Sequence, residues 1–436
     1  MSAPGARARA CLETVDPVEV RGRVTAVTGL AARAVLGEAC VGEVAEIEVA
    51  GRPPLPAEVV GFREGEAVLL PYGDLGGVGP DCPVRALGAA PSVRVGPELL
   101  GRVLDGLGRP LDGRPLPGGL RAWALDRPAP SPLRRPLVAR PLATGVRAID
   151  GPLTLGEGQR IGLFAGPGAG KSTLLGQIAR QAKADAVVVG LVGERGREVR
   201  EFVERSLGPE GRSRAVVVAA TGDEPALVRV QAARTATALA EWLADEEGRS
   251  VLLLLDSVTR VARAWREAGL AAGEPPARQG FPPSVFAALP RLLERAGPRE
   301  RGCITAVYTV LAAGGDLEDP IADEVRGLLD GHVVLDGRLA GRGWFPAVDL
   351  PRSLSRLLPA VASARHRAAA ARLRELVDAL ERVRELVELG AYAAGSDPLA
   401  DEALARRGAI EAFLRQPADE PAGFDETVAR LEAALA

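Results

Sequence analysis

A glycine-rich loop at residues 165–172 constrains the possible folds of this chain more than any other feature, because a strand-like run precedes it and a helix-forming run follows it. The apolar run RIGLF precedes the loop, and the helix-forming run TLLGQIARQAKA follows it. The stretch fits the Walker A pattern, with alanine at the first glycine position. Glycines let backbone N–H groups turn toward phosphate, and the following helix presents its N-terminus to the same negative charge. The residues that we expect to bind ATP here are Ala165, Gly166, Pro167, Gly168, Ala169, Gly170, Lys171, Ser172 and Thr173.

A nucleotide site of the Walker type also needs a lysine followed by a hydroxyl residue, and an acidic residue at the end of a buried strand. Lys171 would reach the β- and γ-phosphate oxygens, and the Ser172 hydroxyl would ligate Mg²⁺. Residues 251–255 form a buried apolar run that ends in Asp256, which fits Walker B. A carboxylate at the C-terminal end of a parallel strand lies where ligands bind in an α/β sheet, and Asp256 would hold Mg²⁺ through water. The sequence therefore predicts ATP and Mg²⁺ as cofactors.

A charged segment, VGERGRE, directly follows the strand-like run AVVVGLV. Hydrolysis of a phosphoanhydride needs a carboxylate that polarises the attacking water. Glu194 would stand at a strand end, on the same sheet edge as Lys171, and Arg195 could meet the γ-phosphate charge. A solvated start of a charged helix is the alternative reading of this spacing.

The pattern of apolar runs and turn residues divides the chain into three regions. Short Val-rich runs separated by Gly and Pro predict a small antiparallel β-barrel within residues 1–95. Apolar runs of strand length alternate with helical stretches in residues 96–357, which predicts a RecA-like P-loop domain with a parallel sheet. That region contains a loop-rich stretch, GRVLDGLGRPLDGRPLPGG, and a Pro/Arg-rich connector at residues 126–141. Residues 358–436 carry helical periodicity, so the fold class is multi-domain α/β with a C-terminal helical domain.

Composition excludes several other classes of protein. The 436 residues carry a formal net charge of −3, so no overall positive field would draw in nucleic acid. The cysteines are far apart and form no CxxC pair, which argues against zinc and disulfides and fits a reducing cytosol; they are Cys11, Cys40, Cys82 and Cys303. We see neither a signal peptide nor an apolar run of membrane-spanning length, and expect a cytoplasmic protein.

Longer motifs resemble one known family. They include GERGREV, DSVTRVARAWREAGLAAGEPPARQGFPPSVFAALPRLLERAG, ITAVYTVL, PIADEVRGLLDGH and FPAVDLPRSLSR. The resemblance extends from GRVLDGLGRPLDG and PLATGVRAIDG to the C-terminal GAYAAGSDPLADEA and IEAFLRQ. Together they are similar to the type III secretion ATPases, a family with flagellar and injectisome members that is related to the catalytic subunit of rotary ATP synthases.

The resemblance implies roles for four residues. Glu194 looks like the family's catalytic glutamate, and Arg356 in SLSRLLPA looks like the arginine finger that reaches a neighbouring subunit's γ-phosphate. Phe345 looks like the aromatic that stacks on adenine, with a core aromatic as the alternative. Arg260 matches a family arginine near the phosphates. The segments TGDEPALVRVQA and AAGGDLEDP depart from the usual family pattern, which puts loop dynamics in doubt.

The resemblance also implies an activity and partners. The protein would hydrolyse ATP to energise protein export, releasing chaperones and unfolding exported substrates. It would form a homohexameric ring, with the barrel joining subunits and the C-terminal helices facing chaperone–cargo complexes. Stalk and stator or regulator proteins would be further partners, and the ring would lie peripherally at the inner-membrane export gate.

Other functions remain open at this point. A rotary synthase catalytic subunit is the nearest, although FPPSVF and GAYAAGSDPLADEA favour secretion. A hexameric RNA translocase needs aromatic residues in its barrel, and only Phe62 and Tyr72 occur up to residue 120. A structural subunit that holds nucleotide without hydrolysis is disfavoured by Glu194. DSVTRVARA, AGLAAGEPPARQGFPPSVF and the short N-terminal extension favour an injectisome over a flagellum.

Overall fold

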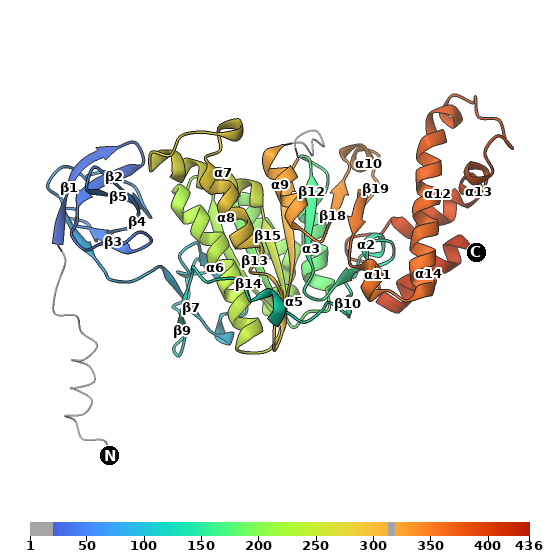
Figure 1. The fold of residues 1–436 in the computed structure, drawn as a ribbon. Helices are drawn as coiled ribbons and strands as arrows, with labels where there is room; N and C mark the ends of the chain where they lie inside the picture. The colour runs from blue at the N-terminus through green and yellow to red at the C-terminus, as the bar shows by residue number, and fades with distance from the viewer. Residues whose placement is uncertain (1–20, 313–318) are drawn as a thin grey trace, which may run out of the picture. The chain divides into compact units, whose positions relative to one another are not determined.

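The computed structural model describes residues 21–312 and 319–436 (Figure 1). Cys11, the N-terminal segment and most of AAGGDLEDP therefore lie outside the described residues. The chain divides into two compact units. The first runs to Ser92 and includes the short segments Pro225–Val228 and Glu267–Pro275, and the second contains the rest of the chain.

The N-terminal unit is a closed barrel of six strands, joined in the order β1-β2-β5-β4-β3-β6. All neighbouring strands pair antiparallel, and small apolar side chains such as Ala32, Ala45 and Ala57 fill the interior completely buried. Closure removes the unpaired strand edges that an open sheet of this size would expose. The predicted small antiparallel barrel is confirmed, with strands β1 (Arg21–Thr28), β2 (Ala31–Val35), β3 (Val44–Ile47), β4 (Leu55–Arg63), β5 (Glu66–Pro71) and β6 (Pro83–Ala86).

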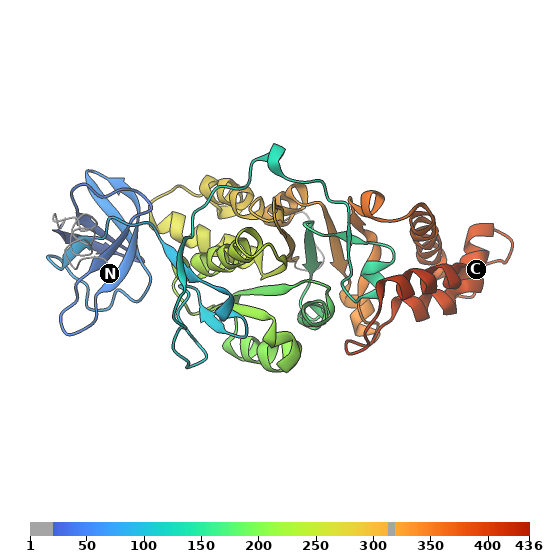
Figure 2. The same cartoon turned by 90° about the horizontal axis from the view of Figure 1, so that it is seen from below.

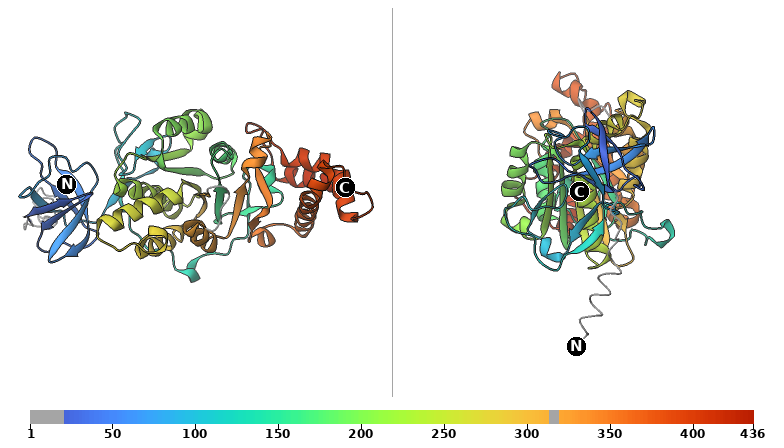
Figure 3. Two further views of the ribbon diagram at one scale, coloured as in Figure 1. Left: turned by 90° about the horizontal axis from the view of Figure 1, so that it is seen from above. Right: turned by 90° about the vertical axis from the view of Figure 1, so that its left-hand side faces the viewer.

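A mostly parallel sheet forms the centre of the second unit, with helices on both faces (Figures 2 and 3). Its order is β19-β18-β12-β17-β15-β13-β14-β8. The apolar runs of the sequence become β12 (Arg160–Ala165), β13 (Ala186–Glu194), β14 (Ala215–Thr221), β15 (Ser250–Asp256), β17 (Cys303–Leu311) and β18 (Gly331–Leu335). Almost every residue of β13 and β15 is buried, as expected for strands covered on both faces. The predicted P-loop sheet is confirmed.

Two edge strands were not expected. β8 (Val103–Asp105) lies within GRVLDGLGRPLDG, which we interpreted as loops, and pairs parallel with β14. β19 (Val348–Ser355) closes the other edge and pairs antiparallel with β18. β8 has three residues beside turn-forming glycines, and β19 carries Pro351 and Arg352 at its centre, so neither has the periodicity of a buried strand.

The main helices of the second unit are α3 (Lys171–Gln181), α6 (Ala226–Asp245), α7 (Val258–Ala271), α8 (Pro283–Leu293) and α9 (Pro320–Leu328). Shorter elements are β7 (Ser92–Val95), which pairs with β9 (Arg121–Ala124), and β10 (Pro141–Leu142), which pairs with β11 (Leu155–Gly156). The others are α2 (Arg147–Asp150), α4 (Gly196–Glu201), a π-helical turn η3 (Phe202–Leu207), α5 (Gly208–Ser213), β16 (Gly297–Pro298), α10 (Gly337–Gly341) and the 3₁₀ turns η1 (Pro97–Leu99), η2 (Pro132–Arg134) and η4 (Arg278–Gly280).

The C-terminal region is helical, as predicted, with α11 (Leu358–Val361), α12 (Ala364–Glu388), α13 (Pro398–Leu414) and α14 (Phe424–Leu435). Ser363 caps α12 by accepting the His366 N–H, and Asp397 caps α13 just before its proline. Buried faces of α12, α13 and α14 share one apolar core with the sheet. Figure 3 shows these helices in red beside the orange strands of the sheet edge. No helix among the described residues is long and apolar enough to cross a membrane.

Candidate active site

The glycine-rich loop joins β12 to α3 as predicted from the sequence. Ala165 ends the strand, Lys171 begins the helix, and Gly166, Pro167, Gly168, Ala169 and Gly170 lie between them. Gly168 and Gly170 have φ angles of 76° and 83°, a left-handed backbone that glycine adopts without strain. The loop therefore bends back over the N-terminus of α3, where Ser172 and Thr173 form the first turn.

Three parallel strands end near this loop; β15 and β13 are neighbours in the sheet, and β17 lies between β15 and β12. β12 leads to Lys171, β13 ends at Glu194, and β15 ends at Asp256. The Lys171 ammonium lies 2.5 Å from an Asp256 carboxylate oxygen and 3.5 Å from a Glu194 carboxylate oxygen. The Glu194 and Asp256 side chains are buried, and the Lys171 side chain is mostly shielded, with 13% exposed. The structure thus gathers one ammonium and two carboxylates at the carboxyl edge of the sheet.

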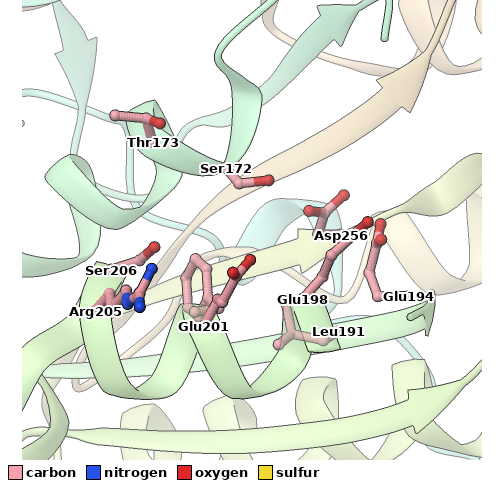
Figure 4. Close-up of a pocket in the computed structure, with 10 residues that line it drawn as sticks. Ser172, Thr173, Leu191, Glu194, Glu198, Glu201, Arg205, Ser206 and Asp256 are labelled. Atoms are coloured by element: carbon pink, nitrogen blue, oxygen red, sulfur yellow. The ribbon is translucent and has the colours of Figure 1, made fainter. Parts of the chain in front are cut away.

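A cavity opens beside this group of charges (Figure 4). In Figure 4 the carboxylates of Glu194, Glu198 and Asp256 gather at one side of the cavity, close to the Ser172 hydroxyl. η3 supplies the opposite side of the cavity, including Arg205 and Ser206. The full lining consists of Ser172, Thr173, Leu191, Glu194, Glu198, Glu201, Phe202, Arg205, Ser206 and Asp256.

Glu194 has an unusual electrostatic environment. Burial raises the pKa of Glu194 to about 7, a hydrogen bond with Glu198 and the charge of Asp256 act in the same direction, and Lys171 and Arg260 oppose them. The Arg260 guanidinium forms an ion pair with a Glu194 oxygen, Oε2, at 2.9 Å and donates a hydrogen bond to the Gly193 carbonyl. The other Glu194 oxygen, Oε1, is buried and has no hydrogen-bond partner. A carboxylate with a pKa near neutrality suits proton transfer, and Oε1 faces only the Lys171 ammonium, at 3.5 Å.

Glu198 and Thr309 belong to this site, and the sequence did not single them out. The hydrogen bond with Glu194 lowers the pKa of Glu198. The Thr309 hydroxyl, on β17, donates to Asp256 Oδ1 at 2.6 Å and restrains that carboxylate. Glu198 lies four residues after Glu194 in the same charged segment, on the helix that follows the strand, and this proximity was the available signal. Thr309 carried none, because its role depends on β17 lying next to β15.

The residues fit a magnesium ion that arrives with a nucleotide. Among the described residues no group of three or more His, Cys, Asp or Glu side chains could hold a metal by itself. Mg²⁺ in nucleotide enzymes usually takes one or two protein oxygens and completes its shell with water and phosphate. The Ser172 hydroxyl and the Asp256 carboxylate, both lining the cavity, supply that kind of donor set.

Arg195 and Arg356 do not join the cavity. The Arg195 side chain is 82% exposed and pairs with Glu198 at 3.2 Å. Arg356 follows the antiparallel strand β19, and its N–H donates to the Asp330 carbonyl beside the first residue of β12, Arg160. It therefore lies at the amino edge of the parallel strands, opposite Lys171. Its exposed guanidinium makes no hydrogen bond or ion pair with the described part of the chain.

Phe345 lies against the end of the glycine-rich loop. A Cβ atom at Gly170 would approach the Phe345 ring to 3.2 Å, so glycine permits this close packing. The Phe345 side chain is also 44% exposed, so it is not a core aromatic. The structure places Phe345 next to the loop, with part of its surface open to a ligand.

Comparisons with known proteins agree with this geometry. The family model described as "ATP synthase alpha/beta family, nucleotide-binding domain" matches residues 145–355, and that described as "T3SS EscN ATPase C-terminal domain" matches residues 362–433. The Type 3 secretion system ATPase of Sinorhizobium fredii is 52% identical over 415 residues, covering 95% of this chain and 92% of that protein. The Flagellum-specific ATP synthase of Bacillus subtilis is 48% identical over 423 residues, covering 97% and 96%.

A solved structure shows the same similarity. It is the assembled ATPase EscN in complex with its central stalk EscO, from the type III secretion system of enteropathogenic E. coli. The TM-score is 0.88 at 44% identity, and the match covers 95% of this chain and all of that chain. The fold, the site and these relatives show that the chain belongs to the ATPase family that contains the type III secretion system ATPases and the flagellum-specific ATP synthases.

Proposed function

We propose that this protein hydrolyses ATP in an Mg²⁺-dependent reaction and uses the free energy for protein export through a type III secretion apparatus. The observation that carries the proposal is the convergence of Lys171, Glu194 and Asp256 at the ends of three parallel strands, beside a helix N-terminus. This is the edge at which α/β sheets bind ligands. The matches to secretion ATPases along the whole chain support the export role.

Each side chain has a task in this reaction. Lys171 binds the β- and γ-phosphates, exchanging its contact with Asp256 for one with the triphosphate. Glu194 uses Oε1, which accepts no hydrogen bond and becomes available when Lys171 turns to the triphosphate, to orient the attacking water and accept its proton, while Arg260 restrains the other oxygen. Arg195 would turn from Glu198 toward the γ-phosphate, and Phe345 would stack on adenine.

Ser172 and Asp256 would hold Mg²⁺, and Thr309 would keep the Asp256 carboxylate in a fixed orientation. The bound ion would neutralise negative charge on the phosphates. The side chains around the ion then need to neutralise only the phosphate charge that Mg²⁺ leaves, and to supply the base that accepts a proton from water.

Arg356 would complete a neighbouring subunit's site. The glycine-rich loop of the same chain lies at the other end of β12, about 17 Å from the end where Arg356 lies, because β12 has six residues. A guanidinium at that distance cannot reach its own γ-phosphate, but it can reach one presented by an adjacent subunit. The assembled state of the similar EscN supports a ring, which we propose to be a homohexamer.

The same resemblance supports the remaining assignments. Residues 1–95 would join subunits, residues 96–357 would hydrolyse ATP, and residues 358–436 would meet chaperone–cargo complexes. A central stalk is a proposed partner because EscN binds one. Stator or regulator proteins and the inner-membrane export gate would be others, with the ring on the cytoplasmic side and no nucleic acid involved.

We assign the protein to an injectisome rather than a flagellum. The names of the relatives include both kinds, so the assignment depends on the segments DSVTRVARA and AGLAAGEPPARQGFPPSVF. A rotary synthase role is disfavoured because residues 362–433 match the EscN C-terminal domain. Disruption of the gene should abolish injectisome secretion and leave swimming intact; loss of motility with normal secretion would reverse the assignment.

The biochemical test is phosphate release by the purified oligomer. Wild-type protein should hydrolyse ATP with Mg²⁺ and lose activity when the metal is chelated. A homogeneous, folded oligomer that releases no phosphate from Mg-ATP would contradict the proposal.

A further inference from the structure

Two sequence motifs without a role in the phosphate chemistry bond to each other. They are PLATGVRAIDG, at residues 141–151, and IEAFLRQ, at residues 410–416. The Gln416 carboxamide accepts the Arg147 N–H at 2.8 Å and donates to the Gly145 carbonyl at 2.8 Å. The Arg147 guanidinium donates in turn to the Phe413 carbonyl at 3.0 Å. Gln416 and Arg147 are almost completely buried, so this joint is shielded from water.

The same C-terminal segment holds the loop that carries Phe345. The Gln416 backbone N–H donates to the Phe345 carbonyl at 2.9 Å. The Arg415 guanidinium stacks over the Trp344 ring, 4.5 Å from its centroid. Arg415 and Gln416 of the C-terminal segment therefore contact the successive loop residues Trp344 and Phe345. Two neighbouring contacts fix the orientation of the loop, which a single contact would not.

The helix that begins at Lys171 contacts this segment as well. Arg180 donates to the Ala418 carbonyl at 2.9 Å, and Gln181 donates to the Glu420 carbonyl at 3.1 Å. Residues 415–420 are thus bonded to the phosphate-loop helix on one side and to the Phe345 loop on the other. Gln416 and Phe345 also line one small cavity together with Gly170 and Thr173.

We propose that Gln416 is a positioning residue for the base end of the nucleotide site. Its side chain, fixed by Gly145 and Arg147, orients the backbone N–H that holds Phe345 against the phosphate loop. Buried amides with all their hydrogen bonds made are rigid, and removing one partner leaves the others unsatisfied. The inference rests on the proposed function, in which Phe345 stacks on adenine. It makes the C-terminal helical region a contributor to ATP affinity.

The test separates affinity for the base from affinity for the phosphates. Gln416→Ala should raise KM for ATP about tenfold, from the loss of side-chain hydrogen bonds, with kcat within about twofold. Inorganic triphosphate has no base, so its inhibition constant should not change. Gln416→Glu keeps the acceptor for Arg147 but loses the donor to the Gly145 and Glu420 carbonyls and turns a carboxylate oxygen toward them, so it should also raise KM for ATP and leave the triphosphate inhibition constant unchanged.

A double-mutant cycle tests whether Gln416 acts through Phe345. Phe345→Ala alone should raise KM, and adding Gln416→Ala should raise it no further, because the positioned group is gone. Additive effects would overturn the proposal. An equal loss of triphosphate binding would also overturn it, since that result indicates general loosening of the site.

Leu431→Ala is the matched structural control. Leu431 is completely buried in α14 and does not line the cavity, so this variant loosens the C-terminal helices without touching the joint. It should leave KM unchanged. If Gln416→Ala does not fold, Gln416→Glu and Arg415→Ala replace it; Arg415 is exposed, and its loss should raise KM about twofold. Inactive wild-type protein would refute the proposed function itself, whereas active protein with KM unaltered in these variants refutes only this inference.

Discussion

Lys171 and Arg356 are cationic groups at opposite edges of the sheet, and they differ in solvent exposure and in their partners. Lys171 is mostly shielded from solvent at the carboxyl edge and pairs with two carboxylates of its own chain. Arg356 is exposed at the amino edge, and its guanidinium has no hydrogen-bond or ion-pair partner in the described residues. In the proposed function, one subunit therefore supplies the phosphate-binding side of a site, and Arg356 of its neighbour supplies a second cation. The following experiments test that division.

The largest effect is expected from Arg356→Ala. An arginine finger contributes about 10³ to 10⁵ in rate, so kcat should fall at least about 10³-fold while ATP binding is nearly unchanged. Measurements of steady-state phosphate release and nucleotide binding check both parts. Arg365→Ala, at another exposed arginine, is the control and should keep full activity. Unaltered turnover in Arg356→Ala would remove the intersubunit half of the comparison.

Mixed rings sharpen the same point. Lys171→Ala and Arg356→Ala should each be inactive, but co-assembled subunits should regain activity, because some interfaces pair an intact loop with an intact arginine. In an equal mixture about one interface in four qualifies, since each position is filled correctly with a chance of about one half. Lys171→Ala mixed with Glu194→Gln should not recover, because both residues serve the same subunit's site. Recovery in that pair would contradict the assignment.

Glu194→Gln should lower kcat about 10²- to 10⁴-fold, because an amide cannot accept the proton of the attacking water. Single-turnover hydrolysis distinguishes this chemical defect from slow product release. The control is Glu204→Gln, at an exposed glutamate that pairs with Arg200. A variant that keeps its turnover would show that another group activates the water.

The pH dependence of kcat/KM, which reports the free enzyme, should be a smaller effect with a definite direction. Burial raises the pKa of Glu194 to about 7, and only the ionised form accepts a proton. Activity should therefore rise with pH through about 7 and fall about tenfold per unit below it. The profile is measured in buffers of constant ionic strength, with Mg-ATP well below KM. A flat profile between pH 5.5 and about 8 would contradict Glu194 as the titrating base.

The smallest effect is expected from Thr309→Val. The substitution removes the hydroxyl that donates to Asp256, and kcat/KM should fall about tenfold or less, with a higher Mg²⁺ requirement. Activity is measured across a magnesium titration. Thr305→Val alters the same strand at its other end, where the hydroxyl accepts the Gly158 N–H, and should leave the magnesium requirement unchanged.

Local patterns determined much of this protein. The strand–loop–helix order around Lys171, the apolar strand before Asp256 and the alternating runs of the barrel each predict their own structure, because they depend on neighbours along the chain. The position of Glu194 at a strand end followed in the same way. The antiparallel edge strand β19 and the three-residue β8 were missed, since neither shows enough periodicity.

Only the tertiary structure decided which of these pieces meet. Insertion of β17 between β12 and β15 brings Thr309 to Asp256, and the antiparallel course of β19 places Arg356 at the far edge. The contact between Gln416 and Arg147 joins residues 269 apart. Strand order and such distant pairings arise from packing summed over the whole chain, and no local run of residues specifies them.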